Sequence, residues 1–294
     1  MIEAQKNITL KQYLKNKNWV TDSKDELKDY VWLQHEKYSF IKYPVFHFAE
    51  PSDAEIKEVF KKSGAKLLSY AVQCSEKEAN AYWYVCRKIS KNELKDTIQR
   101  NIKKAEKNLT LKNVSAEELF TEGFQPYSEM RKRAGLDDFS HEHFIQHFKE
   151  KNIREHNFTI GAYHEGKLIS YISLLVIDNF VEIEGPFTLN DALQYRPNEF
   201  LIYTALDYYI NQMNIPLVTY GFSSIQEMNK ESSLHSFKLK CGFEAIPINR
   251  KFRFSTELML FVNPVSRFVV KYLTKLFPSN RMLRKINGVM QYSI

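Results

Sequence analysis

The sequence has few of the residues that mark a secreted, fibrous or disordered chain. Its 294 residues include only 3 cysteines, 9 glycines and 9 prolines. Cys74, Cys86 and Cys241 are scattered and form no C-x-x-C pair, so neither a disulfide framework nor a thiolate zinc site is indicated. The low glycine and proline content argues against a linker-rich chain. We therefore expect a globular protein of a reducing compartment.

Long apolar runs are also missing. The first residues, MIEAQKNITLKQYLKNKNW, contain no apolar core of signal-peptide length, and no run elsewhere is long enough to cross a bilayer. A composition of 44% hydrophobic and 26% charged residues is typical of a globular protein with enough length to bury a core. The predicted location is the cytoplasm, with a peripheral contact at the inner membrane surface as a further possibility.

The net charge of +7 is unevenly distributed. Residues 263–294 contain six basic residues and no acidic one, and residues 87–112 contain nine basic and three acidic residues. Two local basic patches favour a defined anionic partner over a diffuse coat of counterions.

The first hundred residues read as helices followed by two strands. The spacing of Leu27, Tyr30 and Val31 predicts a helix over residues 22–38, and Ser52 is placed to cap a second helix that ends at Gly64. Further along are two strands, 65–74 and 80–89, joined as a hairpin, and a basic helix over 90–108.

From residue 109 the predicted elements follow a distinctive order. A strand, two helices, a three-strand meander, a buried helix over 199–213, a strand, a helix over 232–241 and a final strand give β-α-α-β-β-β-α-β-α-β. This order resembles the acyltransferase fold of the GNAT superfamily. The resemblance implies an α+β fold with a mixed central sheet, a splayed strand pair and flanking helices, in two GNAT-like lobes of which the N-terminal one is degenerate.

Two stretches resemble the FemAB-like branch of that superfamily, and a short R-x-G-like element follows the first of them. TIQRNIKKAEKNLTLKNV is similar to its basic R-N-I-x-K-A helix, Arg133-Ala134-Gly135 to its R-x-G element, and SLHSFKLKCGFE to its L-x-x-F-K-x-x-F-G signature, with Cys-Gly in place of Phe-Gly. The resemblance covers residues 88 to 254. It implies an accessory lobe over 1–107, a catalytic domain over 108–262 and basic amphipathic helices over 263–294.

The resemblance implies that the splayed strands bind the pantetheine arm of acetyl-coenzyme A or another acyl-coenzyme A, and that the next helix receives the pyrophosphate at its N-terminus. Asn198 is placed to cap that helix, and Arg196 stands at its mouth; the alternative is that Arg196 is a surface residue. Glu199 and Phe237 complete the expected cofactor contacts. The loop departs from the coenzyme A-binding pattern because it has no glycine after Gly185.

Lys238 is out of place for a short amphipathic helix. At 100° per residue, Leu234, Phe237 and Cys241 form one apolar face, and Lys238 lies at its edge, whereas Lys240 points away into solvent. The FemAB-like pattern places this lysine at the acyl-transfer centre, where a cation stabilises a developing oxyanion. The alternative is a lysine whose stem covers Leu234 and whose ammonium reaches water.

Transfer to an amine also needs a base. Glu182 and Glu184 share one face of strand 180–187, and we expect Glu184 to be the base; the alternative is a solvated strand face. Tyr220 is the candidate proton donor to the leaving group. The expected acceptor contacts are Arg133, His235 and Ser223.

No metal site is expected. His143 and His147 stand four residues apart, with His141 nearby, but Glu142 does not complete an H-E-x-x-H motif and no third ligand suggests itself, so a solvated helix face is the favoured interpretation.

The C-terminal helices carry an apolar stripe that includes Phe268, Tyr272 and Leu276, with Arg267, Lys271 and Lys275 in a basic row beside it. One interpretation is a helix that closes the core or forms a subunit interface. The other is a peripheral contact of residues 266–287 with an anionic membrane.

Together these features predict an N-acyltransferase that moves an acetyl group from acetyl-coenzyme A to the amine of a small-molecule acceptor, an amino sugar or nucleotide-linked sugar of envelope polysaccharide synthesis. The first alternative is a FemAB peptidyltransferase that takes its amino acid from aminoacyl-tRNA to a peptidoglycan precursor. The second is a non-catalytic binder of anionic glycan or RNA.

Overall fold

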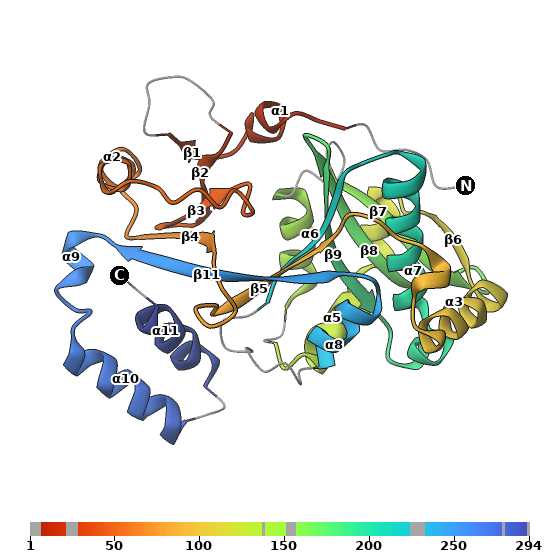
Figure 1. The fold of residues 1–294 in the computed structure, drawn as a ribbon. Helices are drawn as coiled ribbons and strands as arrows, with labels where there is room; N and C mark the ends of the chain where they lie inside the picture. Colours follow the sequence, from red (N-terminus) through yellow and green to blue (C-terminus); the bar gives the residue numbers. More distant parts are fainter. Residues whose placement is uncertain are drawn as a thin grey trace. The chain divides into compact units, whose positions relative to one another are not determined.

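The computed structural model describes residues 7–21, 29–136, 139–150, 157–223, 233–277 and 280–292 (Figure 1). The chain divides into two compact units, each assembled from separate stretches of sequence. Unit 1 is drawn from residues 1–13, 84–221 and 233–245, and unit 2 from residues 14–83, 222–232 and 246–294. Two strands, β5 (Ala81–Cys86) and β11 (Glu244–Phe254), contribute residues to both units.

Unit 1 is built on a mixed sheet in the strand order β5-β10-β9-β8-β7-β6. The pairs β6–β7, β7–β8 and β8–β9 are antiparallel, whereas β9 and β10 are parallel. The order of strands predicted from residue 109 onward is confirmed, whereas the single helix predicted over 115–135 is two helices, Ala116–Glu122 and Phe124–Arg133, which meet at Gly123. The bounds are β6 (Thr110–Asn113), β7 (Asn157–His164), β8 (Lys167–Ile177), β9 (Phe180–Thr188) and β10 (Leu217–Phe222).

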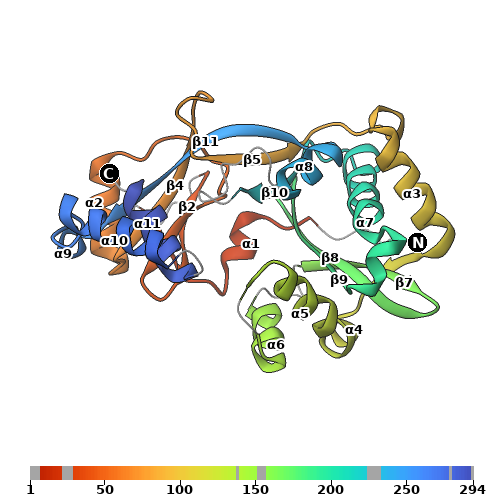
Figure 2. The same cartoon turned by 90° about the horizontal axis from the view of Figure 1, so that it is seen from below.

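Helices cover both faces of this sheet. In Figure 2, α7 and α3 lie on one side of β8 and β9, and α5 lies on the other with α4 and α6. An aromatic cluster that includes Tyr127, Phe144 and Tyr171 fills the α5 side. The bounds of the α-helices are α1 (Leu10–Leu14), α3 (Asp96–Asn108), α4 (Ala116–Glu122), α5 (Phe124–Arg133), α6 (His141–Glu150), α7 (Pro197–Leu206) and α8 (Ser233–Lys240). Two short 3-10 helices are η1 (Lys91–Glu93) and η2 (Asp191–Tyr195), and a π-helical turn, η3 (Asp207–Gln212), follows α7.

Local sequence explains where these elements begin and turn. The Ser115 hydroxyl accepts a hydrogen bond from the Glu118 amide and caps α4, as predicted. The predicted β7–β8 hairpin is also confirmed, and its turn residues Glu165 and Gly166 have φ of 50° and 81°. Two successive positive φ values match the right-handed twist of the flanking strands, which is why glycine suits this turn.

Unit 2 contains a second sheet segment in the order β1-β2-β3-β4-β11-β5. Its core packs α2 against the sheet around Trp32, Phe40 and Val59. As predicted, Ser52 caps α2 and Gly64, in the left-handed region, ends it. The bounds are β1 (Trp19–Val20), β2 (Val31–Glu36), β3 (Ser39–Tyr43), α2 (Asp53–Ser63), β4 (Leu67–Gln73), α9 (Thr256–Met259), α10 (Pro264–Leu276) and α11 (Arg281–Gln291).

Two predictions for this unit are wrong. The predicted helix over 22–38 is strand β2 from Val31 onward, and its first half lies outside the described residues. Val31, Trp32 and Leu33 are all buried, so this segment packs on both faces and its alternation was hidden. Strands β4 and β5 do not form a hairpin, because β11 lies between them and pairs antiparallel with β4, from Ile248↔Gln73 to Phe254↔Leu67.

Of the helices in the described part of the chain, none combines the length and apolarity that crossing a membrane requires.

A buried lysine lies in the core of unit 2. Lys42 is 2% exposed, its ammonium donates to the Ala49 carbonyl, and Nζ lies 4.1 Å from the centre of the Tyr30 ring. The Tyr30 hydroxyl donates to Glu55 at 2.8 Å. Burial lowers the pKa of Lys42 to about 8, although the carboxylates of Glu55 and Glu50 oppose this shift.

This pKa predicts that unit 2 becomes more stable as the pH rises from about 8 to 10.5. In that range the unfolded chain keeps a proton on Lys42 that the native state has lost, so the free energy of unfolding increases, by about 2 kcal/mol after allowance for solvent screening. Urea unfolding measured across this range should show the rise in the wild type and a smaller one in Lys42→Met. Lys61→Met, at an exposed position of α2, is the control and should retain the wild-type slope; equal slopes in all three would contradict the assignment.

Candidate active site

The site begins where strands β9 and β10 part. Their parallel register runs through three pairs, from Leu217↔Phe180 to Thr219↔Glu182, while β9 continues to Thr188 and β10 to Phe222. Beyond the last pair a side chain joins the strands: the Tyr220 hydroxyl donates to the Gly185 carbonyl. In the described part of the chain the β9–β10 pairing ends at Thr219 and Glu182, which agrees with the parting of two central strands that the resemblance implies.

Lys238 of α8 reaches the first residue beyond that last pair. Its ammonium donates to the Tyr220 carbonyl at 2.9 Å and lies 4.2 Å from the ring centres of both Tyr220 and Tyr84. The side chain is 4% exposed. The alternative of an ammonium that reaches water is therefore wrong; the cation is held by a carbonyl and two aromatic faces, which is a favourable setting for a buried charge.

The helix itself differs from the predicted apolar face. Lys238 is the one buried residue of α8, whereas Leu234 is 49% exposed. Cys241, just after the helix, is buried, and burial raises the pKa of its thiol, so it is a packing residue and not a nucleophile. Gly242 ends α8 with φ of 96°, and a Cβ there would lie 2.6 Å from Ile89 Cδ1. A residue with a side chain would be strained at this position, which is why glycine suits the end of α8.

Tyr84 connects the lysine to a histidine. Its hydroxyl lies 2.8 Å from Nδ1 of His235, one turn before Lys238 on α8, and the two rings meet edge to face at 5.7 Å. The ring face of Tyr84 therefore contacts the Lys238 ammonium, and its hydroxyl is hydrogen-bonded to the His235 imidazole. Burial raises the pKa of Tyr220 far above its usual value, so that hydroxyl keeps its proton at all ordinary pH values.

The two candidate bases lie on β9, on either side of the end of the register. Glu182 takes part in the last pair, and Glu184 precedes the glycine whose carbonyl receives the Tyr220 hydroxyl. Both side chains are partly exposed. An oxygen of Glu184 lies 3.7 Å from Nε2 of His147 on α6, so a histidine singled out for a possible metal site is instead the neighbour of a candidate base.

The predicted cofactor residues are largely engaged elsewhere in unit 1. Asn198 does not cap α7: the helix begins at Pro197 with Arg196 as N-cap, and the Asn198 side chain accepts a hydrogen bond of 2.6 Å from Thr188. Glu199 accepts a bond from Asn101 of α3 at 2.8 Å. Arg196 is exposed with φ of 62°. Phe237 is half-buried on α8.

The predicted acceptor residues are not gathered in one place. His235 belongs to the Lys238 cluster, whereas Arg133, at the end of α5, donates to the Asn190 side chain. Ser223 belongs to unit 2, where its hydroxyl accepts a bond of 2.8 Å from the Tyr82 amide. That bond is structural, since it satisfies a strand amide.

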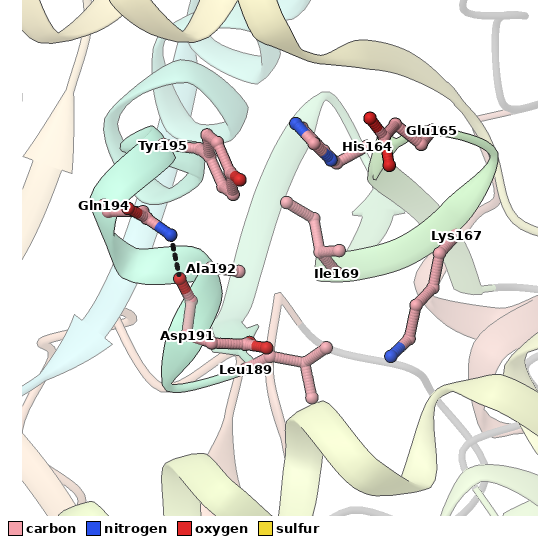
Figure 3. A pocket seen from close by; sticks show the side chains of 9 residues that line it. All are labelled: His164, Glu165, Lys167, Ile169, Leu189, Asp191, Ala192, Gln194 and Tyr195. Atoms are coloured by element: carbon pink, nitrogen blue, oxygen red, sulfur yellow. Dashed lines mark hydrogen bonds between the residues drawn. The ribbon is translucent and has the colours of Figure 1, made fainter.

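The loop before α7 lines a cavity of about 380 Å³ (Figure 3). The cavity lies between η2 and the β7–β8 turn. The rings of His164 and Tyr195 stack at 4.2 Å along it, and Lys167 extends from the hairpin side. The remaining lining residues are Glu165, Ile169, Leu189, Asp191, Ala192 and Gln194. The loop expected to contact the donor thus borders a cavity, although without the glycine-rich amide nest.

Sequence reasoning missed Tyr84 and the role of His147 as a neighbour of Glu184. Tyr84 lies in the run AYWYVC, in which every residue is buried, so nothing in the pattern distinguishes it from a core aromatic residue. His147 was visible only as one of two histidines four residues apart. Its proximity to Glu184 depends on the packing of α6 near β9, which local sequence does not encode.

Comparison with known proteins shows the fold. No family model and no curated protein sequence matches the chain. The structure is similar to that of FemX, with a TM-score of 0.55 and 10% identity over 80% of this chain and 88% of that one. It is also similar to L-PGS from Bacillus licheniformis, with a TM-score of 0.50 and 11% identity over 89% of this chain and 90% of that one.

A weaker similarity, to a GCN5-related N-acetyltransferase from Kribbella flavida, has a TM-score of 0.43 and 10% identity over 81% and 89% of the two chains. The predicted fold class, a mixed α+β fold with a central sheet flanked by helices, is confirmed, and it is the fold shared with FemX.

We expect the hydrogen bond from the Tyr220 hydroxyl to the Gly185 carbonyl to stabilise β9 and β10 beyond their last pair. Tyr220→Phe keeps the ring beside Lys238 but removes the donor to Gly185, so we expect a loss of about 1 kcal/mol in unfolding free energy and faster hydrogen exchange of amides near residues 185–188 and 220–222. Tyr38→Phe, at an exposed position, is the control and should stay within about 0.5 kcal/mol of the wild type. Unchanged exchange in Tyr220→Phe would contradict the role.

Proposed function

We propose that the protein is an acyltransferase that moves an acyl group to an amine at the parting of β9 and β10. The observation that carries the proposal is the ammonium of Lys238, 4% exposed and 2.9 Å from the carbonyl of the first residue beyond the β9–β10 register. The ammonium is held by a carbonyl and two aromatic faces, and in the proposed reaction it also stabilises the negative charge that forms beside it. The resemblance of SLHSFKLKCGFE to the FemAB-like signature supports the same assignment.

The proposed reaction needs no covalent enzyme intermediate. The amine nitrogen attacks the acyl carbonyl carbon, the new C–N bond forms, and the bond to the leaving group breaks with its electron pair on sulfur or oxygen. Glu184, with Glu182 as the alternative, removes the proton that the amine loses. Lys238 stabilises the tetrahedral oxyanion, an effect of about 3 kcal/mol for one donor in a site that excludes water. The proton that the base accepts passes to the leaving sulfur or oxygen, which balances the step. Tyr220, the predicted proton donor, is poorly suited to that role because burial raises its pKa far above the usual value and its hydroxyl already donates to the Gly185 carbonyl.

The first candidate donor is acetyl-coenzyme A or another acyl-coenzyme A, with the amine of an amino sugar or nucleotide-linked sugar as acceptor. Beyond Glu182 the described strands β9 and β10 are not paired, and there we expect main-chain groups of β9 to meet a pantetheine amide. In the cavity beside η2, Lys167 and His164 are the groups that would meet the anionic end of the donor, and Glu165 and Asp191 line the same cavity.

A second donor, aminoacyl-tRNA, is favoured by two features of unit 1. Helix α3 buries Ile98, Ile102 and Ala105 and exposes Arg100, Lys103, Lys104 and Lys107. Such a row is suited to nucleic-acid phosphates. At the N-terminus of α7, Pro197 lacks an amide hydrogen and Glu199 adds negative charge, which is unfavourable for a pyrophosphate.

Replacing Lys238 should strongly reduce turnover without unfolding the protein. Because the substitution removes the charge that stabilises the oxyanion, Lys238→Met is expected to lower kcat by about 100-fold. The assay follows release of free coenzyme A from acetyl-coenzyme A with a panel of amino sugars, and in parallel transfer from aminoacyl-tRNA. Lys240→Met, two residues along the same helix and exposed, is the matched control and should keep wild-type activity.

Wild-type kcat in Lys238→Met would refute the assigned role of the lysine. Absence of transfer from either donor, combined with unchanged binding of glycan or RNA in Lys238→Met, would favour a non-catalytic binder.

The basic row on α3 separates the two donors. Lys103→Glu/Lys107→Glu is expected to raise KM for aminoacyl-tRNA at least tenfold, because two phosphate contacts become repulsive, and to leave KM for acetyl-coenzyme A unchanged. Lys57→Glu/Lys61→Glu, an exposed pair with the same spacing on α2, controls for the change in net charge. An equal effect of both double substitutions on aminoacyl-tRNA would show that α3 is not its binding surface.

A further inference from the structure

The C-terminal segment of unit 2 exposes an unusual amount of apolar side chain. Within the described chain, eleven of the fifteen exposed large hydrophobic residues lie between Met259 and Ile286. Leu260, Phe261 and Val265 are 76%, 72% and 72% exposed. Apolar patches of this kind on a folded protein mark a surface that contacts something else.

Helix α10 explains why these residues remain uncovered. At 100° per residue, one arc carries Val265, Phe268, Val269, Tyr272 and Leu276, all of them exposed. A different arc, with Val270, Leu273 and Thr274, is half-buried, and the Thr274 hydroxyl lies 3.4 Å from the Leu283 carbonyl of α11. The helix therefore packs against α11 through one side (Figure 1) and presents a second apolar side to solvent. None of its residues is buried, so the expectation that it closes the core is wrong.

The charges beside this apolar arc identify its partner. Lys271 and Lys275 are exposed on the flank of the arc, Arg267 follows on the same side, and residues 263–294 contain no acidic residue. A second copy docking through the same face would bring two basic rows together, which is unfavourable. The interface of an anionic lipid bilayer matches both the apolar arc and the basic flank of α10. Its acyl chains can receive the apolar side chains, and its headgroups attract the lysines.

The length of the helix determines how it would lie. Thirteen residues span about 20 Å, less than the roughly 30 Å hydrocarbon core of a bilayer. The helix is therefore suited to lie in the interface plane with its apolar arc facing the acyl chains.

We propose that α10, together with Leu260 and Phe261 before it and Met282 and Ile286 of α11, docks the protein on an anionic lipid surface. The inference rests on unit 2 alone and does not depend on the proposed transferase activity.

The test uses the full chain and vesicles of phosphatidylcholine, either pure or with about one third phosphatidylglycerol, in a co-sedimentation assay. Binding is expected to the anionic vesicles, to be at least tenfold weaker to the neutral ones, and to decrease as salt is raised. Lys271→Gln/Lys275→Gln should weaken binding about 25-fold, roughly fivefold for each lost charge. Phe268→Ser/Leu276→Ser should weaken it at least tenfold, since it removes apolar side chains from the acyl boundary.

Matched controls separate a specific surface from general charge or hydrophobicity. Lys57→Gln/Lys61→Gln has the same charge change and spacing on α2, and Tyr38→Ser removes an exposed aromatic residue elsewhere in unit 2; both should bind vesicles as the wild type does. Because the α10 positions are exposed, all variants should keep the wild-type melting temperature.

Failure of the wild type to bind anionic vesicles would overturn the proposal, as would equal binding to neutral ones or wild-type binding by either α10 variant. A dimer in light scattering that Phe268→Ser/Leu276→Ser dissociates, without any vesicle binding, would assign the surface to a second copy instead.

Discussion

The ammonium of Lys238 is the constraint around which unit 1 is arranged. Removing a charge of this kind from water costs several kcal/mol unless nearby groups replace its hydration. Here the replacement comes from two strands at once: the Tyr220 carbonyl and ring from β10, and the Tyr84 ring from β5. The parting of β9 and β10 and the register of α8 must therefore agree for the lysine to be accommodated. If the proposed transferase role holds, this arrangement makes the site preorganised, because the cation is in place before a substrate binds.

The two units contain buried lysines with similar surroundings and different charge partners. In each, the ammonium donates to a backbone carbonyl and lies about 4 Å from a tyrosine ring centre. The carboxylates of Glu55 and Glu50 also attract the Lys42 ammonium electrostatically. Glu55 in turn accepts hydrogen bonds from Tyr30 and Trp32. That network is satisfied within the core, as expected of a structural group. Lys238 instead stands where a strand pair opens, which is why we assign function to one lysine and structure to the other.

Local patterns in the sequence predicted most of unit 1 and much less of unit 2. Helices with a capping serine and a terminal glycine, such as α2 and α4, and the β7–β8 hairpin follow from signals a few residues apart. Strand β2 was mistaken for a helix because burial on both faces erased its alternation, and the insertion of β11 between β4 and β5 involves residues about 180 positions apart.

For the site, Lys238 was predicted to be functional because it is a charged residue at the edge of the apolar face of a short helix. The face it occupies was not predicted, since Leu234 is exposed and the lysine is inside. The partners Tyr84 and His147 follow only from tertiary packing. Asn198 illustrates the reverse case: its place in the sequence suits a helix cap, but the helix begins one residue earlier and the Asn198 side chain accepts a hydrogen bond from Thr188.

The threading of β11 through unit 2 has a consequence for biosynthesis. Strand β4, completed by residue 73, faces an empty edge until residues 248–254 emerge from the ribosome and pair with it. During synthesis of the intervening chain, the edge of β4 that later pairs with β11 therefore remains exposed. Closing so long a loop is slow, and unpaired edges attract other chains. Translation that stalls before residue 254 would release a fragment lacking the strand that completes its sheet, a natural client for chaperones.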